Sequence, residues 1–567
     1  MRFGNKTLLS AALGLALLGG AAAFVPAVQA AGAQTIDIAY QEFTLPNGLR
    51  VIVHTDRKAP IVAVNIWYHV GSKDETPGRT GFAHLFEHLM FQGSENYRDE
   101  FFGPFERVGA TDQNGTTNTD RTNYFQNVPT TALDMALWME SDRMGHFLGA
   151  VDQSLLDEQR GVVQNEKRQG ENQPYGVLRE PLSKARFPKG HPYSWTTIGS
   201  MNDLNAASLE DVKSWFRRAY GPNNAVLVLA GDIDLATAKE KVAKYFGDIP
   251  AAPNFIQPKV DVAPMKTDSR LVLTDKVPQV SRNRIWNVAQ TGTPEEEDLD
   301  LFAQVLGGSS SSRLDRRLVH QEKLVDNISA SYFGSQLSGG FQIGATIKQG
   351  VDPKKVEAIV DEELKKLLAE GPTQAELDQA KVAAKSGFIR QIERIGGFGG
   401  KADVLASCTI YQNNPGCFRT SLANMEKATP ASVKAAGNKW LKSGSLFAIV
   451  EPGERKPAVE EPSVARTAAP AIGVANKKFK TLPAGVDRSL GVPKTESFPD
   501  LSFPALQRAT LSNGLNVVLA SRPGIPVVQM NMLFGGGFST DAGKKLGTAS
   551  FATTMLSQGA GEYDALA

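Results

Sequence analysis

Cysteine is almost absent from this sequence of 567 residues, which contains only Cys408 and Cys417. Two cysteines with no histidine near them exclude a cysteine-based metal site and a disulfide-rich scaffold. The turn sequence Asn-Asn-Pro-Gly lies between them. In an oxidising compartment the pair could therefore close a small loop as a disulfide. Two separate buried thiols are the alternative.

Net charge and long apolar runs are also scarce. Lysine and arginine together number 61 and aspartate and glutamate 60, which leaves a net charge of +1. Such a balance provides no broad basic surface for a phosphate backbone, so we expect no nucleic-acid partner. Beyond residue 30, no stretch approaches the roughly 20 apolar residues that span a bilayer, so we expect no stable membrane insertion.

The first thirty residues have the pattern of a signal peptide. Arg2 and Lys6 give a positive start, an apolar run follows from Leu8 to Phe24, and Val28-Gln29-Ala30 provides small residues for cleavage. We therefore assign residues 1–30 to a cleavable signal peptide and expect a periplasmic or secreted protein. A membrane anchor is the alternative.

The remaining chain is too long for one hydrophobic core. Alternating strand-like runs and helical stretches, such as LRVIVHTD and AVNIWYHV followed by 79–92, predict an α/β domain over 31–255. Residues 256–452 repeat this order of elements. Seven prolines then mark 453–504 as an extended linker.

A duplicated segment follows the linker. The sequence TLPNGL that begins at Thr44 returns as TLSNGL at Thr510, an offset of 466 residues. The same offset aligns Gly71 with Gly537 and further glycines beyond, without gaps. Residues 505–567 are therefore predicted to be the incomplete start of a third repeat.

The sequence His-Leu-Phe-Glu-His, from His84 to His88, carries the clearest chemistry. Positions i and i+4 lie one above the other on a helix, so two imidazoles can face one metal ion. Glu87 shares that side and could act as a general base. Two histidine ligands are typical of zinc, and they leave room for a third ligand and a water. The alternative is an amphipathic helix with two solvated histidines.

The third repeat argues against that alternative. At the same offset the three residues become Ser550, Thr553 and Thr554. A duplicated helix that lacks these groups did not need them for folding. The first copy is therefore predicted to have them for chemistry, and the third repeat to be inactive.

The order of this motif is that of the inverzincins, and the chain resembles the insulinase/pitrilysin family of zinc peptidases. The resemblance implies an α+β fold of repeated two-layer domains, each a mostly antiparallel sheet covered by helices. It also implies one Zn²⁺ per chain and a third ligand from a later helix, which matches Glu166. The family often has a second acid seven residues earlier, where this sequence has Gln159. The domain over 256–452 is then non-catalytic.

The family resemblance also indicates where substrate binds. The run VGATDQNGTTNTD is similar to an edge strand to which substrate backbone adds as a further strand. Asn114, Gly115 and Thr117 are the expected contacts, with Gly115 in place of the family's usual alanine. A polar strand with no binding role is the alternative.

We therefore predict a zinc-dependent endopeptidase that hydrolyses peptides or unfolded polypeptides. In this family a second half closes over the first, and this sequence ends inside the third repeat. It is therefore expected to be a truncated, exported bacterial member that uses a complementary second-half chain or forms a homodimer. The alternative is a non-catalytic scaffold that binds zinc or peptide, or an inactive fragment that needs a partner half.

Overall fold

The computed structural model describes residues 36–456, 472–474, 476–500, 502–521 and 524–564. The signal peptide assigned to residues 1–30 lies outside these ranges. Residues 1–36 are a separate unit, and the description that follows concerns the unit that begins at Asp37. Within the described residues, no helix combines the length and the apolar character that crossing a bilayer requires.

The first sheet has six strands in the order β1-β2-β6-β3-β5-β4, and only β2 and β6 are parallel neighbours. Strand β6 is buried along its whole length because helices cover both faces of the sheet, with α3 (Leu133–Gly145) on one face and α13 (Lys401–Gln412) on the other. A strand buried on both faces reads as an unbroken apolar run, as AVLVLAG does. The strand bounds are β1 (Gln41–Thr44), β2 (Arg50–Thr55), β3 (Ile61–Tyr68), β4 (Thr111–Thr117), β5 (Thr122–Pro129) and β6 (Ala225–Gly231).

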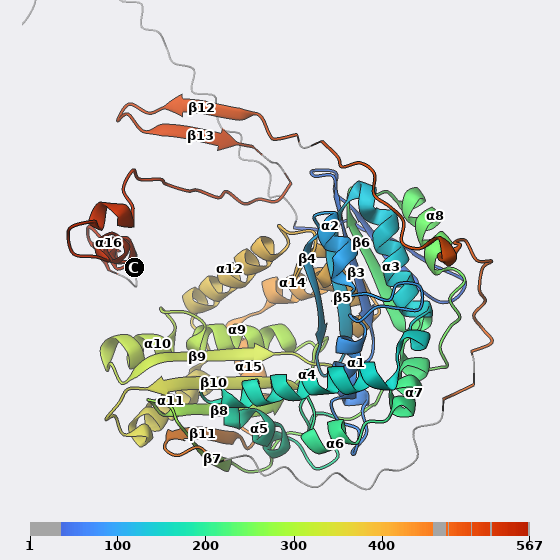
Figure 1. Ribbon diagram of the computed structural model, residues 1–567. Coiled ribbons are helices and arrows are strands. Elements are labelled where there is room, and N and C mark those ends of the chain that lie inside the picture. The colour runs from blue at the N-terminus through green and yellow to red at the C-terminus, as the bar shows by residue number, and fades with distance from the viewer. Residues whose placement is uncertain (1–35, 457–471, 475, 501, 522–523, 565–567) are drawn as a thin grey trace, which may run out of the picture. The chain divides into compact units, whose positions relative to one another are not determined.

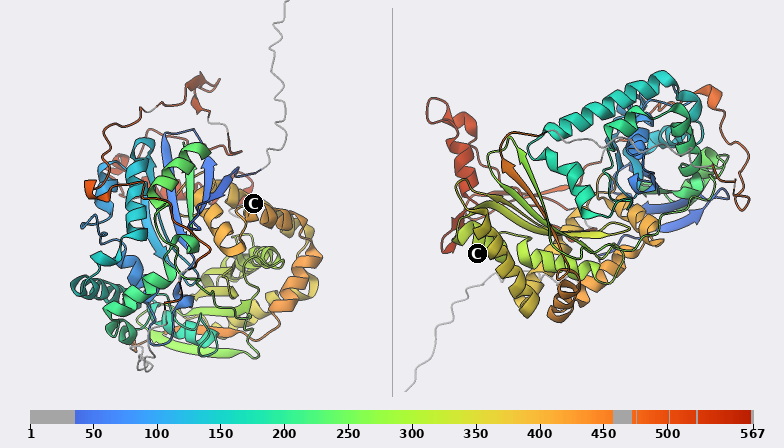
Figure 2. Two further views of the ribbon diagram at one scale, coloured as in Figure 1. Left: turned by 90° about the vertical axis from the view of Figure 1, so that its right-hand side faces the viewer. Right: turned by 90° about the horizontal axis from the view of Figure 1, so that it is seen from below.

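The second sheet repeats this topology in the order β7-β11-β8-β10-β9, again with one parallel pair, β7 and β11. Its helices pack on one face around a second apolar core (Figures 1 and 2). The predicted fold class, repeated units that each have a mostly antiparallel sheet covered by helices, is confirmed, except that α13 adds a third layer to the first sheet. The bounds are β7 (Ser269–Asp275), β8 (Ser281–Val288), β9 (Val325–Phe333), β10 (Gly339–Ile347), β11 (Leu446–Pro452), α9 (Glu296–Gly307), α11 (Pro353–Glu370), α12 (Gln374–Gln391), α14 (Cys417–Lys427) and α15 (Pro430–Trp440).

Helix α13 belongs to the second half by sequence but packs on the first sheet. Its Asp403 Oδ1 accepts hydrogen bonds from Asn65 Nδ2 at 3.3 Å and from Trp67 Nε1 at 3.2 Å. At its start, Lys401 Nζ lies 2.9 Å from Asp56 Oδ2 in an ion pair that is largely buried. The two sheets are therefore joined through a helix that covers a face of the first one.

Cys408 and Cys417 are joined by a disulfide that links α13 to α14. Both residues are buried. Closing a loop of this length stabilises the folded state by about 2–3 kcal/mol in the chain-entropy model. The bond also fixes the end of α13, the helix that contacts the first sheet.

The described part of the proline-rich linker has no regular structure apart from a 3-10 helix at Arg488–Leu490, and it contacts the domain of the first sheet. The Leu482 N–H donates to the Gly247 carbonyl at 2.8 Å. Arg488 donates to Asp142 Oδ1 and to the Tyr245 carbonyl, both at 3.1 Å. Asp142 belongs to α3, and Tyr245 to α8 (Leu235–Phe246). The linker is thus held against these two helices at several points.

The third repeat reproduces the local geometry of the first. Strands β12 (Leu506–Thr510) and β13 (Asn516–Ala520) pair Thr510 with Asn516, the same register in which β1 and β2 pair Thr44 with Arg50. Helix α16 (Thr548–Met555) coincides at the same offset with α1 (Phe82–Leu89). The counterpart of β3 forms no strand among the described residues, because β3 is held between β5 and β6 and neither has a counterpart there.

Asp300 on α9 gives the second core a pH dependence. Burial, and then the charge of Glu296, raise the pKa of Asp300 to about 6. The unfolded chain, with a pKa of about 3.9, therefore releases this proton first, and the free energy of unfolding falls as pH rises from 4 to 6. We expect Asp300→Asn to stabilise the protein at pH 7 by roughly 2 kcal/mol and to have little effect at pH 4.

Thermal denaturation at the two pH values checks this expectation. Asp261, which is exposed, is the matched control, because Asp261→Asn removes a charge without relieving burial. A stabilisation by Asp300→Asn that is equal at pH 4 and pH 7 would contradict the assignment.

Candidate metal centre

Helix α1 carries the first two candidate ligands, and a buried acid fixes its start. Its cap residue, Gly81, has a φ of +90° and no side chain with which to bond the free N–H groups of the first turn. The carboxylate of Glu75 replaces such a cap: it accepts from the Gly81 N–H at 3.0 Å and from the Ala83 N–H at 2.8 Å. A carboxylate is favourable here because a helix N-terminus carries partial positive charge.

The same cap occurs in the third repeat. Asp541, at the position equivalent to Glu75, is buried and accepts from the Ala549 N–H at 3.2 Å, and Gly547 has the same φ as Gly81. This copy lacks the two histidines and Glu87. The acidic cap is therefore a property of the fold and does not depend on the metal residues.

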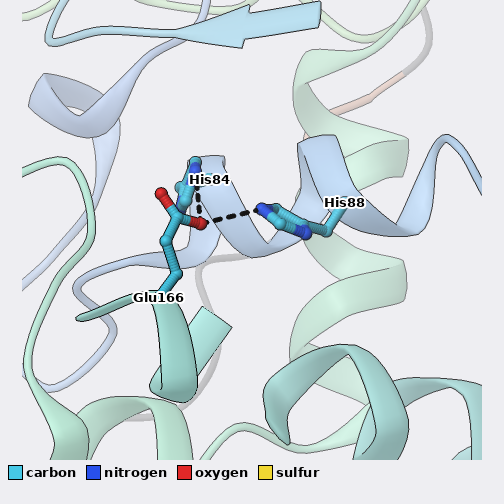
Figure 3. Close-up of side chains that lie close together, drawn as sticks. All are labelled: His84, His88 and Glu166. Atoms are coloured by element: carbon cyan, nitrogen blue, oxygen red, sulfur yellow. Dashed lines mark ion pairs between the residues drawn. The ribbon is translucent and has the colours of Figure 1, made fainter. Parts of the chain in front are cut away.

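The three predicted ligands converge from two helices (Figure 3). Helix α4 (Gln153–Asn172), capped by Asp152, packs against α1 and carries Glu166. Glu166 Oε2 lies 3.3 Å from His88 Nε2 and 3.7 Å from His84 Nε2. The ligand atoms of the three side chains lie within 4.8 Å of one another, a spacing that could hold one metal ion.

The charge states of these groups suit a divalent cation. Burial, and then the neighbouring charge of His88, lower the pKa of His84 to about 4, so its imidazole is neutral at neutral pH. The pKa of Glu166 is lowered, chiefly by its hydrogen bond with His88 and further by the positive charge of Arg179. A neutral imidazole and an ionised carboxylate are the forms in which these side chains bind zinc.

Gln159, which replaces the family's second acid, does not hold the ring of His84. It is buried on α4, but His84 Nδ1 has no hydrogen-bond partner within the described residues. Metal-binding histidines commonly donate this second N–H to a carboxylate or carbonyl, which fixes the ring. The ring of His84 instead contacts the ring of His88, with the two centroids 4.8 Å apart.

Glu87 lies beside the ligands and is 8% exposed. Its Oε2 accepts a hydrogen bond from Thr117 Oγ1 at 2.5 Å. Burial raises the pKa of Glu87, and the Thr117 hydrogen bond partly offsets this effect. The structure thus gives Thr117, expected from sequence to contact substrate, a direct contact with the candidate base.

Asn114 and Gly115 lie on β4, an edge strand of the first sheet. Asn114 Oδ1 accepts from the Gly115 N–H at 2.8 Å, so this edge N–H is bonded by its own strand. A Cβ at position 115 would lie 2.6 Å from the Phe91 ring, closer than such contacts allow. An alanine at this position would therefore require the rings of Phe91 and Tyr124 to shift.

A cavity of about 660 Å³ opens at the candidate centre. Its lining includes His84, Thr117 and Glu166 together with the start of helix α5 (Arg179–Arg186).

Comparison with known proteins identifies the family. The family description "Insulinase (Peptidase family M16)" matches residues 50–197, which contain His84, Glu87, His88 and Glu166. The description "Peptidase M16 inactive domain" matches residues 206–383. The chain belongs to the insulinase family. The first matched segment carries strands β2 to β5 of the first sheet, and the second carries β6 of the first sheet together with β7 to β10 of the second.

Insulinase-family relatives among curated proteins are named as zinc proteases. One, "Zinc protease PqqE" of Helicobacter pylori, is 29% identical over 62% of this chain and 80% of its own length. Another, "Uncharacterized zinc protease YmxG" of Bacillus subtilis, is 26% identical over 62% of this chain and 84% of its own length.

Solved structures of the same family share the fold. A protease from Helicobacter pylori has a TM-score of 0.68 at 25% identity and covers 73% of this chain and 100% of its own. A peptidase M16 inactive domain from Pseudomonas fluorescens has a TM-score of 0.64 at 20% identity, with 74% and 99% coverage. The second similarity concerns the fold alone.

Proposed function

We propose that this protein is a zinc-dependent endopeptidase that acts on peptides or unfolded polypeptides. The observation that carries the proposal is the convergence of His84, His88 and Glu166, with the buried Glu87 beside them. Two histidines and one carboxylate are a donor set typical of catalytic zinc. When bound, zinc would supply a Lewis acid that polarises a peptide carbonyl and lowers the pKa of a water molecule.

The chain's own residues would handle the proton and the substrate. Glu87 would accept a proton from the attacking water and pass it to the leaving amine, as a general base and then an acid. The Thr117 hydroxyl, bonded to Glu87 Oε2, would hold the carboxylate in position. The substrate backbone would add to the edge strand β4 at Asn114 and Gly115, where it would displace the Asn114 side chain from the Gly115 N–H. The peptide bond would then lie near Glu87, which Thr117 of the same strand contacts.

We also propose that the protein works outside the reducing cytoplasm. The disulfide between Cys408 and Cys417 supports this, since such bonds persist in oxidising compartments. The sequence of the first thirty residues, which reads as a signal peptide, agrees with export.

Cleavage of a quenched fluorescent peptide library, with and without a zinc chelator, tests the proposal. We expect cleavage that the chelator abolishes and that added zinc restores, with one zinc bound per chain. Cleavage that is insensitive to the chelator would contradict a metal-dependent mechanism. Stoichiometric zinc with no cleavage would instead support a binding scaffold.

A further inference from the structure

The cavity at the candidate centre contains positive charge that the proposed mechanism does not use. Two of its cations are paired: Lys167 lies 2.7 Å from Glu180 Oε2, and Arg455 lies 2.6 Å from Asp275 Oδ1. The other two cations, Arg179 and Lys456, make no hydrogen bond or ion pair within the described residues. The four cationic side chains of the lining are Lys167, Arg179, Arg455 and Lys456.

Arg179, one of the two unpaired cations, lies close to the candidate ligands. It begins α5 and is exposed to solvent, and its guanidinium lies over Gly170 of α4, where an added Cβ would be 2.9 Å from Arg179 Nη1. Gly170 follows Glu166 by four residues and so lies on the same face of α4, about 6 Å along the helix axis. The guanidinium is thus about one helical turn from the candidate ligand Glu166.

The glycine at position 170 makes this placement possible. A Cβ there would force the guanidinium to shift, and a longer side chain would force it further away, whereas glycine is otherwise unfavourable in a helix. Gly161, on the same helix, has no atom within 4 Å of where its Cβ would lie. The two glycines therefore differ in their surroundings. A charged group lies next to the Cβ position of Gly170, whereas no atom lies next to that of Gly161.

We propose that Arg179 determines specificity by binding a carboxylate of the peptide, with Lys456 as a second cation in the same cavity. The planar guanidinium can donate two parallel hydrogen bonds to a carboxylate. An extended peptide advances about 3.3 Å per residue, so the bound group lies about two residues from the scissile bond. The ligand is an acidic side chain or the peptide's own C-terminal carboxylate. This inference rests on the proposed peptidase function.

Peptide binding to the full-length, zinc-loaded Glu87→Gln variant tests the inference without turnover. Fluorescence anisotropy would compare matched octapeptides that carry glutamate or glutamine at each position, with free or amidated C-termini. In low salt we expect one glutamate position, or the free C-terminus, to bind roughly 5- to 20-fold more tightly than its neutral counterpart. The scan shows which of the two carboxylates is bound.

Substitutions at Arg179 test whether this residue causes the preference for acidic peptides. Adding Arg179→Gln should abolish the preference, and adding Arg179→Glu should transfer it to peptides with lysine at that position. Equal affinities for acidic and neutral peptides, or a preference that survives Arg179→Gln, would overturn the inference. A preference that survives Arg179→Gln would show that the metal ion, rather than Arg179, binds the carboxylate of the peptide.

The glycine pair provides a matched control that leaves Arg179 in place. Gly170→Ala should reduce the preference for acidic peptides at least 3-fold by displacing the guanidinium, whereas Gly161→Ala should not change it. Equal effects of the two substitutions would count against the placement of Arg179.

The inference and the proposed function can fail separately. If the unsubstituted protein cleaves peptides without any charge preference, only this inference is contradicted. If it binds acidic peptides selectively but does not cleave them, only the peptidase function is contradicted.

Discussion

Glu87→Gln is expected to lower kcat for peptide cleavage by about 100- to 10,000-fold, the usual contribution of a general base. The amide has nearly the shape of the carboxylate but cannot accept the proton of the attacking water. Glu87 is buried beside the candidate ligands without being one of them. The zinc content should therefore stay at one per chain, and steady-state kinetics together with metal analysis checks both parts.

The hydrogen bond from Thr117 supplies a graded control for this prediction. Thr117→Val keeps the shape of the side chain but removes the hydroxyl that donates to Glu87 Oε2, and we expect a decrease in kcat of about 10-fold, near the value of one hydrogen bond to a charged group. Thr117→Ser keeps the donor and should lose much less. If Glu87→Gln retained full activity, or lost its zinc, the role assigned to Glu87 would be wrong.

Glu166→Gln is expected to weaken zinc binding by at least about 100-fold, because replacing groups that only orient the ligands already costs 10- to 100-fold. The substitution removes the one negative charge of the donor set and leaves His84 and His88 in place. Competition against a chromophoric chelator measures the affinity. Cleavage should fall in proportion to the zinc lost, and excess zinc should restore part of it.

Glu158 is the matched control for this experiment. It is an exposed glutamate on the same helix, two turns before Glu166, so Glu158→Gln removes the same charge at a distance from the site. We expect its zinc affinity to stay within about 2-fold of the unsubstituted protein, since exposed charges more than a Debye length apart interact weakly. A similar loss in both variants would show that the net charge of α4, rather than ligation, controls zinc binding.

Two of the three candidate ligands could be predicted because they follow a spacing rule. His84 and His88 are one helical turn apart, and the repeat at offset 466 showed that folding does not require them. Glu166 could not be found in this way. Its position depends on the packing of α4 against α1, and only the family resemblance indicated it before the structure brought the three side chains together.

The contacts that orient the side chains of the site could not be predicted from the sequence. The cap from Glu75 and the hydrogen bond from Thr117 join residues that follow no helical or strand period with their partners. The docking of α13 onto the first sheet was missed for a similar reason. Periodicity identifies a helix and its apolar face, but it does not say which of two sheets that face will cover.

The acidic caps at Glu75 and Asp541 affect which substitutions such a protein can accept during evolution. Each copy of the helix begins at a left-handed glycine whose neighbouring N–H groups are bonded by a carboxylate from the preceding segment, whether or not histidines follow. The side chains for metal binding can therefore be gained or lost in one copy while the helix keeps its start. After gene duplication, that independence allows one copy to retain chemistry while its sister becomes purely architectural.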